Sequence, residues 1–147
     1  MKAMRVVFAA VVSSLLALST FTWWALESGG VAVIETHAAN GSLRSTHVWF
    51  AEPGGELWLE AGTPENAWYR DVKRDPRVSF SARELSGQYL ARPIEGSGAH
   101  DEIRSLLREK YGVRDWWIGV LFDTSRSVAV QLVSLPAESQ AASGRSR

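Results

Sequence analysis

Two strand-like runs joined by a glycine turn, between Arg44 and Glu60, most constrain the fold of this chain. Residues 44–50 place β-branched and aromatic residues at strand spacing, and Pro53-Gly54-Gly55 is typical of a hairpin turn. Residues 56–60 alternate polar and apolar positions, which predicts a half-buried strand with Trp58 on its outer or ligand-facing side. The segment therefore predicts an antiparallel β-hairpin.

A short helix is predicted directly after this hairpin. Thr63 suits the N-cap position and Pro64 the first helical position. We expect the helix to end before Asp75-Pro76, because the residue before a proline avoids helical angles.

Short strand patterns continue along the rest of the chain. Ser86-Gly87 is predicted as a turn between two of them, and residues 115–122 fit a helix or a strand. The further predicted strands are 31–36, 77–83, 88–94 and 127–135, and an amphipathic helix is predicted over 99–110. About six strands with two intervening helices predict a mainly β fold with flanking helices, closed into a small barrel.

The N-terminal segment is apolar. Residues 6–26 carry no charge and are long enough to cross a membrane as one helix. Lys2 and Arg5 precede them, which by the positive-inside rule puts the domain outside the cytoplasm. A cleaved signal peptide and a buried core helix are the alternatives. The predicted parts are an anchor or signal segment (1–28), a barrel domain (29–136) and a disordered tail (137–147).

Composition excludes several function classes. The formal net charge is zero and basic residues are interleaved with acidic ones, so nothing indicates nucleic-acid binding. The chain has no cysteine, which excludes thiolate catalysis and cysteine zinc sites. His37, His47 and His100 lack metal-ligand spacing, so we expect no metal site. No catalytic residue is identified by a generic motif.

Three sequence blocks follow one another in a distinctive order. They are Asn40-Gly41 with Arg44-Ser45-Thr46, then Ala67-Trp68-Tyr69, then Asp75-Pro76-Arg77-Val78. In this order the chain resembles the split β-barrel oxidoreductases of the deazaflavin-dependent nitroreductase and quinone reductase family, relatives of the flavin-binding pyridoxamine-phosphate oxidases. The resemblance covers residues 31–135. It implies a split β-barrel that binds a deazaflavin (coenzyme F-420) or FMN, usually at a homodimer interface.

The resemblance also implies a site. In the family, a basic turn before the second strand holds the cofactor phosphate; its two lysines are Ala39 and Ser42 here, and Asp71 replaces a helix Asn. The implied cofactor-binding residues are Gly41, Arg44, Ser45, Thr46, Gly62, Thr63, Trp68 and Tyr69. The implied substrate pocket contains His47, Trp116 and Trp117.

Each of these residues also has a structural interpretation. Arg44 fits a solvated strand-end arginine, Thr63 a plain helix N-cap, and His47 a hydrogen-bonded structural histidine. Trp68-Tyr69 fits a pair of core aromatics. Trp116-Trp117 fits either the wall of an apolar pocket or a lipid contact.

Two functional hypotheses follow. The first is a membrane-tethered oxidoreductase in which a reduced deazaflavin or flavin reduces a quinone-like or other small lipophilic acceptor, with the cofactor supplying the chemistry. The alternative is a non-catalytic, membrane-anchored module that binds a lipid or another apolar ligand. The missing lysines favour the second, as does a domain outside the cytoplasm, away from the pool of reduced cofactor. A haem- or metal-handling domain has little support in the histidine spacing.

Overall fold

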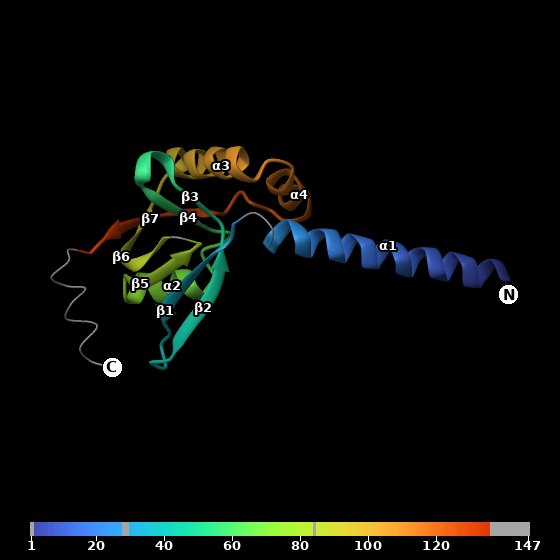
Figure 1. The fold of residues 1–147 in the computed structure, drawn as a ribbon, viewed down its shortest axis with the longest axis horizontal. Helices are drawn as coiled ribbons and strands as arrows, with labels where there is room; N and C mark the ends of the chain where they lie inside the picture. Colours follow the sequence, from blue (N-terminus) through green and yellow to red (C-terminus); the bar gives the residue numbers. More distant parts are fainter. Residues whose placement is uncertain (1, 28–29, 84, 136–147) are drawn as a thin grey trace.

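The computed structural model describes residues 2–27, 30–83 and 85–135. Within this part of the chain, seven strands form one antiparallel sheet in the order β2-β1-β5-β6-β7-β4-β3, and the sheet curls into a half-barrel flanked by helices (Figure 1). The strands are β1 Ala32–His37, β2 Leu43–Val48, β3 Phe50–Ala51, β4 Leu57–Ala61, β5 Arg77–Ala82, β6 Leu85–Ile94 and β7 Val128–Ser134. The helices are α1 Lys2–Glu27, α2 Ala67–Arg74, α3 Ser97–Tyr111 and α4 Val113–Leu121, with a 3-10 turn at Pro53–Gly55.

This architecture confirms the predicted mainly β split barrel. The predicted hairpin over residues 44–60 forms only in part: Phe50 and Ala51 make a separate strand, β3, that pairs with β4, whereas β2 pairs with β1 instead, so the described sheet has seven strands and not about six. The ambiguous segment 115–122 lies mostly in helix α4. The prediction for the tail, residues 137–147, lies outside the described residues.

The main core lies inside the half-barrel. Alternating residues of β1 and β5 point inward, and α2 packs against β1 with its apolar side turned to the same interior. Its largest fully buried members include Phe80, Ile34, Leu59, Val72 and Val78. Trp68 and Tyr69 belong to this core, and their rings meet edge to face at 6.2 Å.

A second core lies between the outer face of the sheet and α3. Ile103, Leu107 and Tyr111 recur at helical spacing on one side of α3 and are buried against Ala51 and Trp58. Trp58 is therefore on the outer face of β4, as predicted, where it is 9% exposed and packs in the cluster under α3. β4 is buried on both faces rather than half-buried.

Two predicted boundaries are wrong. Helix α2 begins at Ala67 and not at Pro64, because Thr63 closes a turn to Asn66 through a backbone hydrogen bond of 3.1 Å. Ser86-Gly87 is not a turn but part of β6, paired with β5. A Cβ added to Gly87 would lie 3.1 Å from the Tyr89 ring, so a larger residue there would press on that ring.

Helix α1 projects from the barrel (Figure 1). Residues 4–24 are long and apolar enough to cross a membrane, and no part of that hydrophobic window is buried inside the described chain. The same length and composition at an N-terminus also fit a signal sequence. Its C-terminal end contacts α4.

A buried ion network fastens α3 and α4 to the sheet. The Arg104 guanidinium donates to both oxygens of Glu60 on β4, at 3.1 and 3.0 Å, and to the carboxylate of Asp115 on α4. Arg104 and Glu60 side chains are each 10% exposed and Asp115 is 1% exposed. One guanidinium thus compensates two buried carboxylates from two different elements.

We predict that Arg104→Met destabilises the chain by about 3–5 kcal/mol, because it leaves two buried carboxylates without their cation. Urea unfolding of the detergent-solubilised protein measures the change. The matched control is Arg108→Met, since Arg108 is 72% exposed and its Nε lies 3.7 Å from Asp115; its loss should cost less than about 1 kcal/mol. Equal effects of the two substitutions would contradict the prediction.

Candidate functional site

A cluster of charged residues stands beside the β1–β2 turn. Arg44 on β2 donates from Nε to Asp71 of α2 at 2.8 Å, and Arg74 of α2 donates to the other Asp71 oxygen at 3.1 Å. Thr36, the ladder partner of Arg44 on β1, donates its hydroxyl to Asp71 at 3.1 Å. Arg74 also donates to the carbonyl of His37, the last residue of β1. The turn, two strands and α2 are therefore linked through one carboxylate.

Burial and charge act in opposite directions on Asp71. Its side chain is 5% exposed, and burial alone would raise the pKa of this carboxyl. The hydrogen bonds from Arg44, Arg74 and Thr36 outweigh burial and lower the pKa below its ordinary value. Asp71 is thus a carboxylate near neutral pH. The two arginine side chains are 41% and 46% exposed, so they carry a net positive charge to the surface.

Three backbone amides of the turn have partners within it. Ala38 N–H donates to Ser42 O, Gly41 N–H to Ala38 O, and Ser42 N–H to the Asn40 side chain. Gly41 has φ +82°, which favours glycine. An open hollow of about 380 Å³ is lined by residues 38–40 and 42–44. Arg44 is the charged residue that lines this hollow.

The other predicted residues of β2 lie on both faces of the strand. Ser45 is exposed on the outer face, where its hydroxyl donates to Glu35 at 3.3 Å. His47 is exposed on the same face. Thr46 is half-buried on the inner face, in line with Arg44.

The predicted residues near α2 do not join the turn hollow. Gly62 and Thr63 precede the helix, and the Thr63 hydroxyl donates to the Asn66 side chain at 3.0 Å. Trp68 is 3% exposed within the main core. Tyr69 lines a separate hollow of about 290 Å³ with Lys73, His100 and others, and burial raises the pKa of its phenol.

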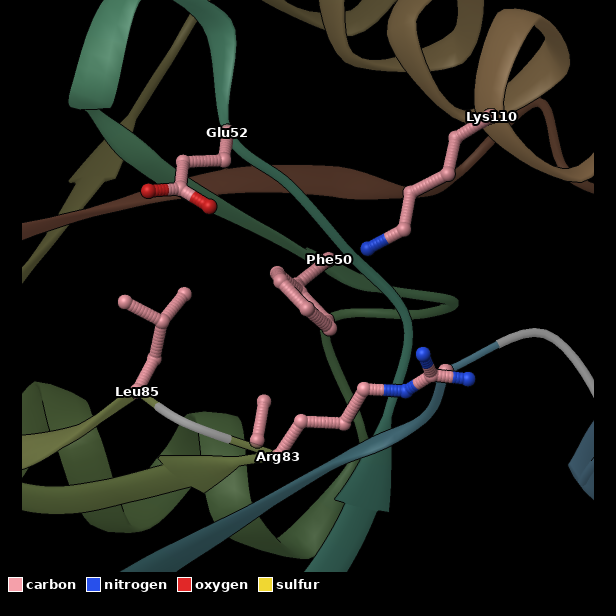
Figure 2. Close-up of a pocket in the computed structure, with 7 residues that line it drawn as sticks. Phe50, Glu52, Arg83, Leu85 and Lys110 are labelled. Atoms are coloured by element: carbon pink, nitrogen blue, oxygen red, sulfur yellow. The ribbon is translucent and has the colours of Figure 1, made fainter.

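A cavity of about 570 Å³ opens at the end of the half-barrel that lies near Gly30 (Figure 2). Its apolar lining is Phe50, Ala82 and Leu85, and its charged lining is Glu52, Arg83 and Lys110. Figure 2 shows that Lys110 reaches into the cavity from the end of α3, above the Phe50 ring. Two cations beside an apolar wall suit an amphipathic ligand that carries negative charge or a polar oxygen.

Lys110 is chemically unusual. Its Nζ lies 3.1 Å from the centroid of the Phe50 ring. The pKa of Lys110 is lowered from 10.5 to about 8, mainly because the amine is partly buried; the negative charge of Glu52 opposes this lowering, and the positive charge of Arg83 adds to it. A substantial fraction of this amine is therefore neutral just above physiological pH.

Sequence reasoning missed the residues of this cavity. Lys110 is readable only as a cation at a helix C-terminus, and Arg83 as the end of a strand. Arg83 has φ 45°, which a sequence pattern for a strand does not indicate. The predicted pocket residues Trp116 and Trp117 are elsewhere: Trp117 donates to Thr22 of α1 at 3.1 Å, and Trp116 is 63% exposed.

Among the described residues, no group of three His, Cys, Asp or Glu side chains could hold a metal ion. His100 Nδ1 lies 3.1 Å from the Ser127 hydroxyl, and His37 lies 3.6 Å from Asp75. Both histidines have local structural partners.

Comparison with known proteins identifies relatives. The model of a family described as F420H(2)-dependent quinone reductase matches residues 22–131. No curated protein matches the sequence.

Several solved structures share this fold at low sequence identity. A conserved hypothetical protein from Mycobacterium tuberculosis is 20% identical, covers 80% of this chain and 80% of its own, and has a TM-score of 0.58. A structure described as an F420-H2 dependent reductase is 23% identical, covers 69% of this chain and 93% of its own, with a TM-score of 0.54. A haem storage protein from Vibrio cholerae is 14% identical, covers 81% and 90%, and has a TM-score of 0.58. At these identities the likeness shows the fold alone.

We predict that Lys110 is acylated faster than Lys2 or Lys73, the other two lysines of the chain, near pH 8. Only the neutral amine reacts, so the rate at Lys110 should rise with pH and level off around its pKa of about 8. Limited reaction with an acylating reagent, followed by peptide mass spectrometry, measures the three rates. A rate at Lys110 that still climbs in proportion to hydroxide above pH 9 would show an ordinary lysine.

Proposed function

Because the chain belongs to the F420H(2)-dependent quinone reductase family, we propose that it is a membrane-tethered reductase of a quinone-like or other lipophilic acceptor. Family membership makes the chain an oxidoreductase with a deazaflavin cofactor, and FMN is also compatible with the fold. The chemistry that a bound reduced deazaflavin supplies is hydride transfer. The side chains of this protein bind the cofactor and the acceptor, orient them toward each other and exclude water.

One observation carries the cofactor proposal: two arginines converge on a buried carboxylate at the turn implied for the phosphate. Asp71 holds Arg44 and Arg74, leaving both guanidiniums partly exposed. Arg74 thereby supplies a second cation where Ala39 and Ser42 replace lysines. Guanidinium forks fixed in place suit phosphate and carboxylate groups. These residues fit the acidic tail of a deazaflavin.

The remaining cofactor contacts stay proposals. Gly41 allows close approach at the turn, and Ser45, Thr46, Gly62 and Thr63 offer small or polar contacts along β2 and before α2. Trp68 and Tyr69 support this region from the core. His47, on the outer face of β2, is proposed to border the substrate.

The cavity at the barrel end suits the acceptor. Its apolar wall, formed by Phe50, Ala82 and Leu85, excludes water from a lipophilic ring. Hydride addition to a quinone puts negative charge on an oxygen, and Lys110 and Arg83 offer positive charge for it. Protonation of that oxygen completes the hydroquinone, and the Lys110 ammonium is a suitable donor because its pKa is about 8.

Helix α1 is proposed as the membrane tether. It has the length and apolarity of a span, with Trp23 and Trp24 at its C-terminal end. A cleaved signal segment is the competing fate, and a homodimer is proposed from the family resemblance. The proposal requires the barrel to face the compartment that holds reduced deazaflavin, which is opposite to the side that the positive-inside rule predicts.

We predict that Arg74→Ala weakens binding of the deazaflavin coenzyme by about 10- to 100-fold, the loss of one or two charge-assisted hydrogen bonds. Fluorescence titration of the full-length protein in detergent measures the affinity. A deazaflavin that lacks the phosphate and acidic tail should bind both proteins equally, which separates loss of the tail contact from misfolding. Arg92→Ala, at an exposed position of β6, is the matched control and should change neither affinity.

The result for the unmodified protein decides between the two functions. Saturable binding of deazaflavin or FMN supports the reductase, and the preferred ligand identifies the cofactor. A folded protein that binds neither would contradict the reductase and favour the non-catalytic module that binds a lipid or another apolar ligand.

We predict that Lys110→Met lowers kcat/KM for a soluble quinone by about 10²- to 10³-fold, because one stabilising charge on the reduced oxygen is lost. The affinity for deazaflavin should not change. Lys73→Met is the matched control, since Lys73 also lies over an aromatic ring, that of Tyr69, at 5.3 Å. Equal losses for Lys73→Met and Lys110→Met would exclude this role of the cavity.

A further inference from the structure

The exposed side of α4 is apolar. Val113, Trp116 and Val120 recur at three- and four-residue spacing and are 70%, 63% and 60% exposed. Leu121 and Phe122, at the helix end, are 41% and 54% exposed. We call these five residues the α4 face. Exposed large side chains gathered in this way mark an interaction surface rather than ordinary surface scatter.

The α4 face adjoins the C-terminal end of α1. Trp117, on the neighbouring side of α4, donates its indole N–H to Thr22 at 3.1 Å and meets the Phe21 ring edge to face at 5.1 Å. The Arg114 guanidinium lies 4.8 Å from the Trp24 ring. These contacts fix α4 beside residues 21–24, the end of the segment that is apolar enough to span a membrane. Figure 1 shows α4 beside this end of α1.

The charges of α4 do not oppose contact with lipid. Asp115, the only carboxylate of the helix, is 1% exposed and is bound by Arg104. Arg114 is half-buried against Trp24. The next carboxylate, Asp123, follows the helix and accepts a hydrogen bond from the Ser125 amide. Tryptophan beside aliphatic residues and an arginine is the side-chain chemistry of the membrane interface.

We propose that the α4 face lies in the boundary between lipid headgroups and acyl chains of the bilayer that α1 crosses. The inference rests on the proposed membrane tether. An interfacial helix of this kind buries its apolar side about 5–10 Å into that boundary. The span provides the argument for lipid over a protein partner, because residues 21–24 already bring α4 to the level where α1 leaves the bilayer.

This contact would orient the barrel. A single helix leaves a domain free to tilt and rotate, whereas a second contact beside it fixes the domain against the bilayer. Lys110, which lines the cavity, is three residues before Val113, the first residue of α4. The α4 face therefore holds the cavity next to the lipid in which a lipophilic acceptor dissolves.

Site-directed labelling tests the proposal, and the absence of cysteine makes each introduced label unique. Full-length chains carrying Val120→Cys, Trp116→Cys, Leu15→Cys or Glu102→Cys are spin-labelled and reconstituted in vesicles of neutral and anionic phospholipid. Accessibility to oxygen and to a water-soluble nickel complex reports the depth of each label. Leu15 lies in the span, and Glu102 is an exposed control on α3. Near-ultraviolet circular dichroism and deazaflavin binding confirm that each variant is folded.

We expect the ratio of oxygen accessibility to nickel accessibility to be several-fold higher for the labels at positions 116 and 120 than for the label at position 102. A buried label at position 15 together with water-exposed labels on α4 would overturn the inference and leave the tether intact. A water-exposed label at position 15 would overturn both. Protection on α4 accompanied by spin–spin coupling, lost on dilution with unlabelled protein, would show a second copy of the chain on this face and would also overturn the inference.

Discussion

The carboxylate of Asp71 is the interaction on which the proposed cofactor site depends. It is buried beneath the β1–β2 turn, and a buried carboxylate is tolerated only when charges and hydrogen bonds compensate it. Thr36, Arg44 and Arg74 provide that compensation from β1, β2 and α2. Because the guanidiniums must stay with Asp71 for the barrel to be stable, their exposed nitrogens are held in fixed positions at the surface.

The arrangement of the helices at the other end of the barrel depends on a different buried charge, the guanidinium of Arg104. Arg104 draws together Glu60 of β4 and Asp115 of α4, so α3 and α4 sit at a set angle on the sheet. That arrangement carries Lys110 over Phe50, and partial desolvation of its amine there lowers the pKa of Lys110 to about 8. It also turns the apolar face of α4 outward, beside α1. The cavity and the proposed lipid contact thus share one structural cause.

Sequence patterns predicted the elements better than the site. The strands around the Pro53–Gly55 turn, the end of α2 before Asp75 and the amphipathic α3 each depend on local periodicity and turn chemistry, whereas the pairing of β2 with β1 instead of β4 is not encoded in that local pattern. The turn at Ser86-Gly87 was wrong because both residues pair with β5 in the sheet, a non-local contact that the local Ser-Gly pattern does not show. The Arg44–Asp71 pair joins residues 27 positions apart, and the Lys110 cavity gathers residues from between positions 30 and 110, so only the tertiary fold brings them together.

At the β1–β2 turn, which is proposed to hold the cofactor phosphate, this chain has lost two lysines and has arginines fixed by a carboxylate. The resembled family has two lysines where this chain has Ala39 and Ser42 and a neutral Asn where this chain has Asp71, whereas here Arg44 and Arg74 are both bound to the carboxylate of Asp71. The loss of the two lysines and the gain of a carboxylate weaken the long-range attraction of an anionic ligand. The remaining cations are ordered before a ligand arrives, so less side-chain entropy is lost on binding. Affinity at such a site depends more on fixed geometry than on net charge, and it is therefore less sensitive to salt than a cluster of free lysines.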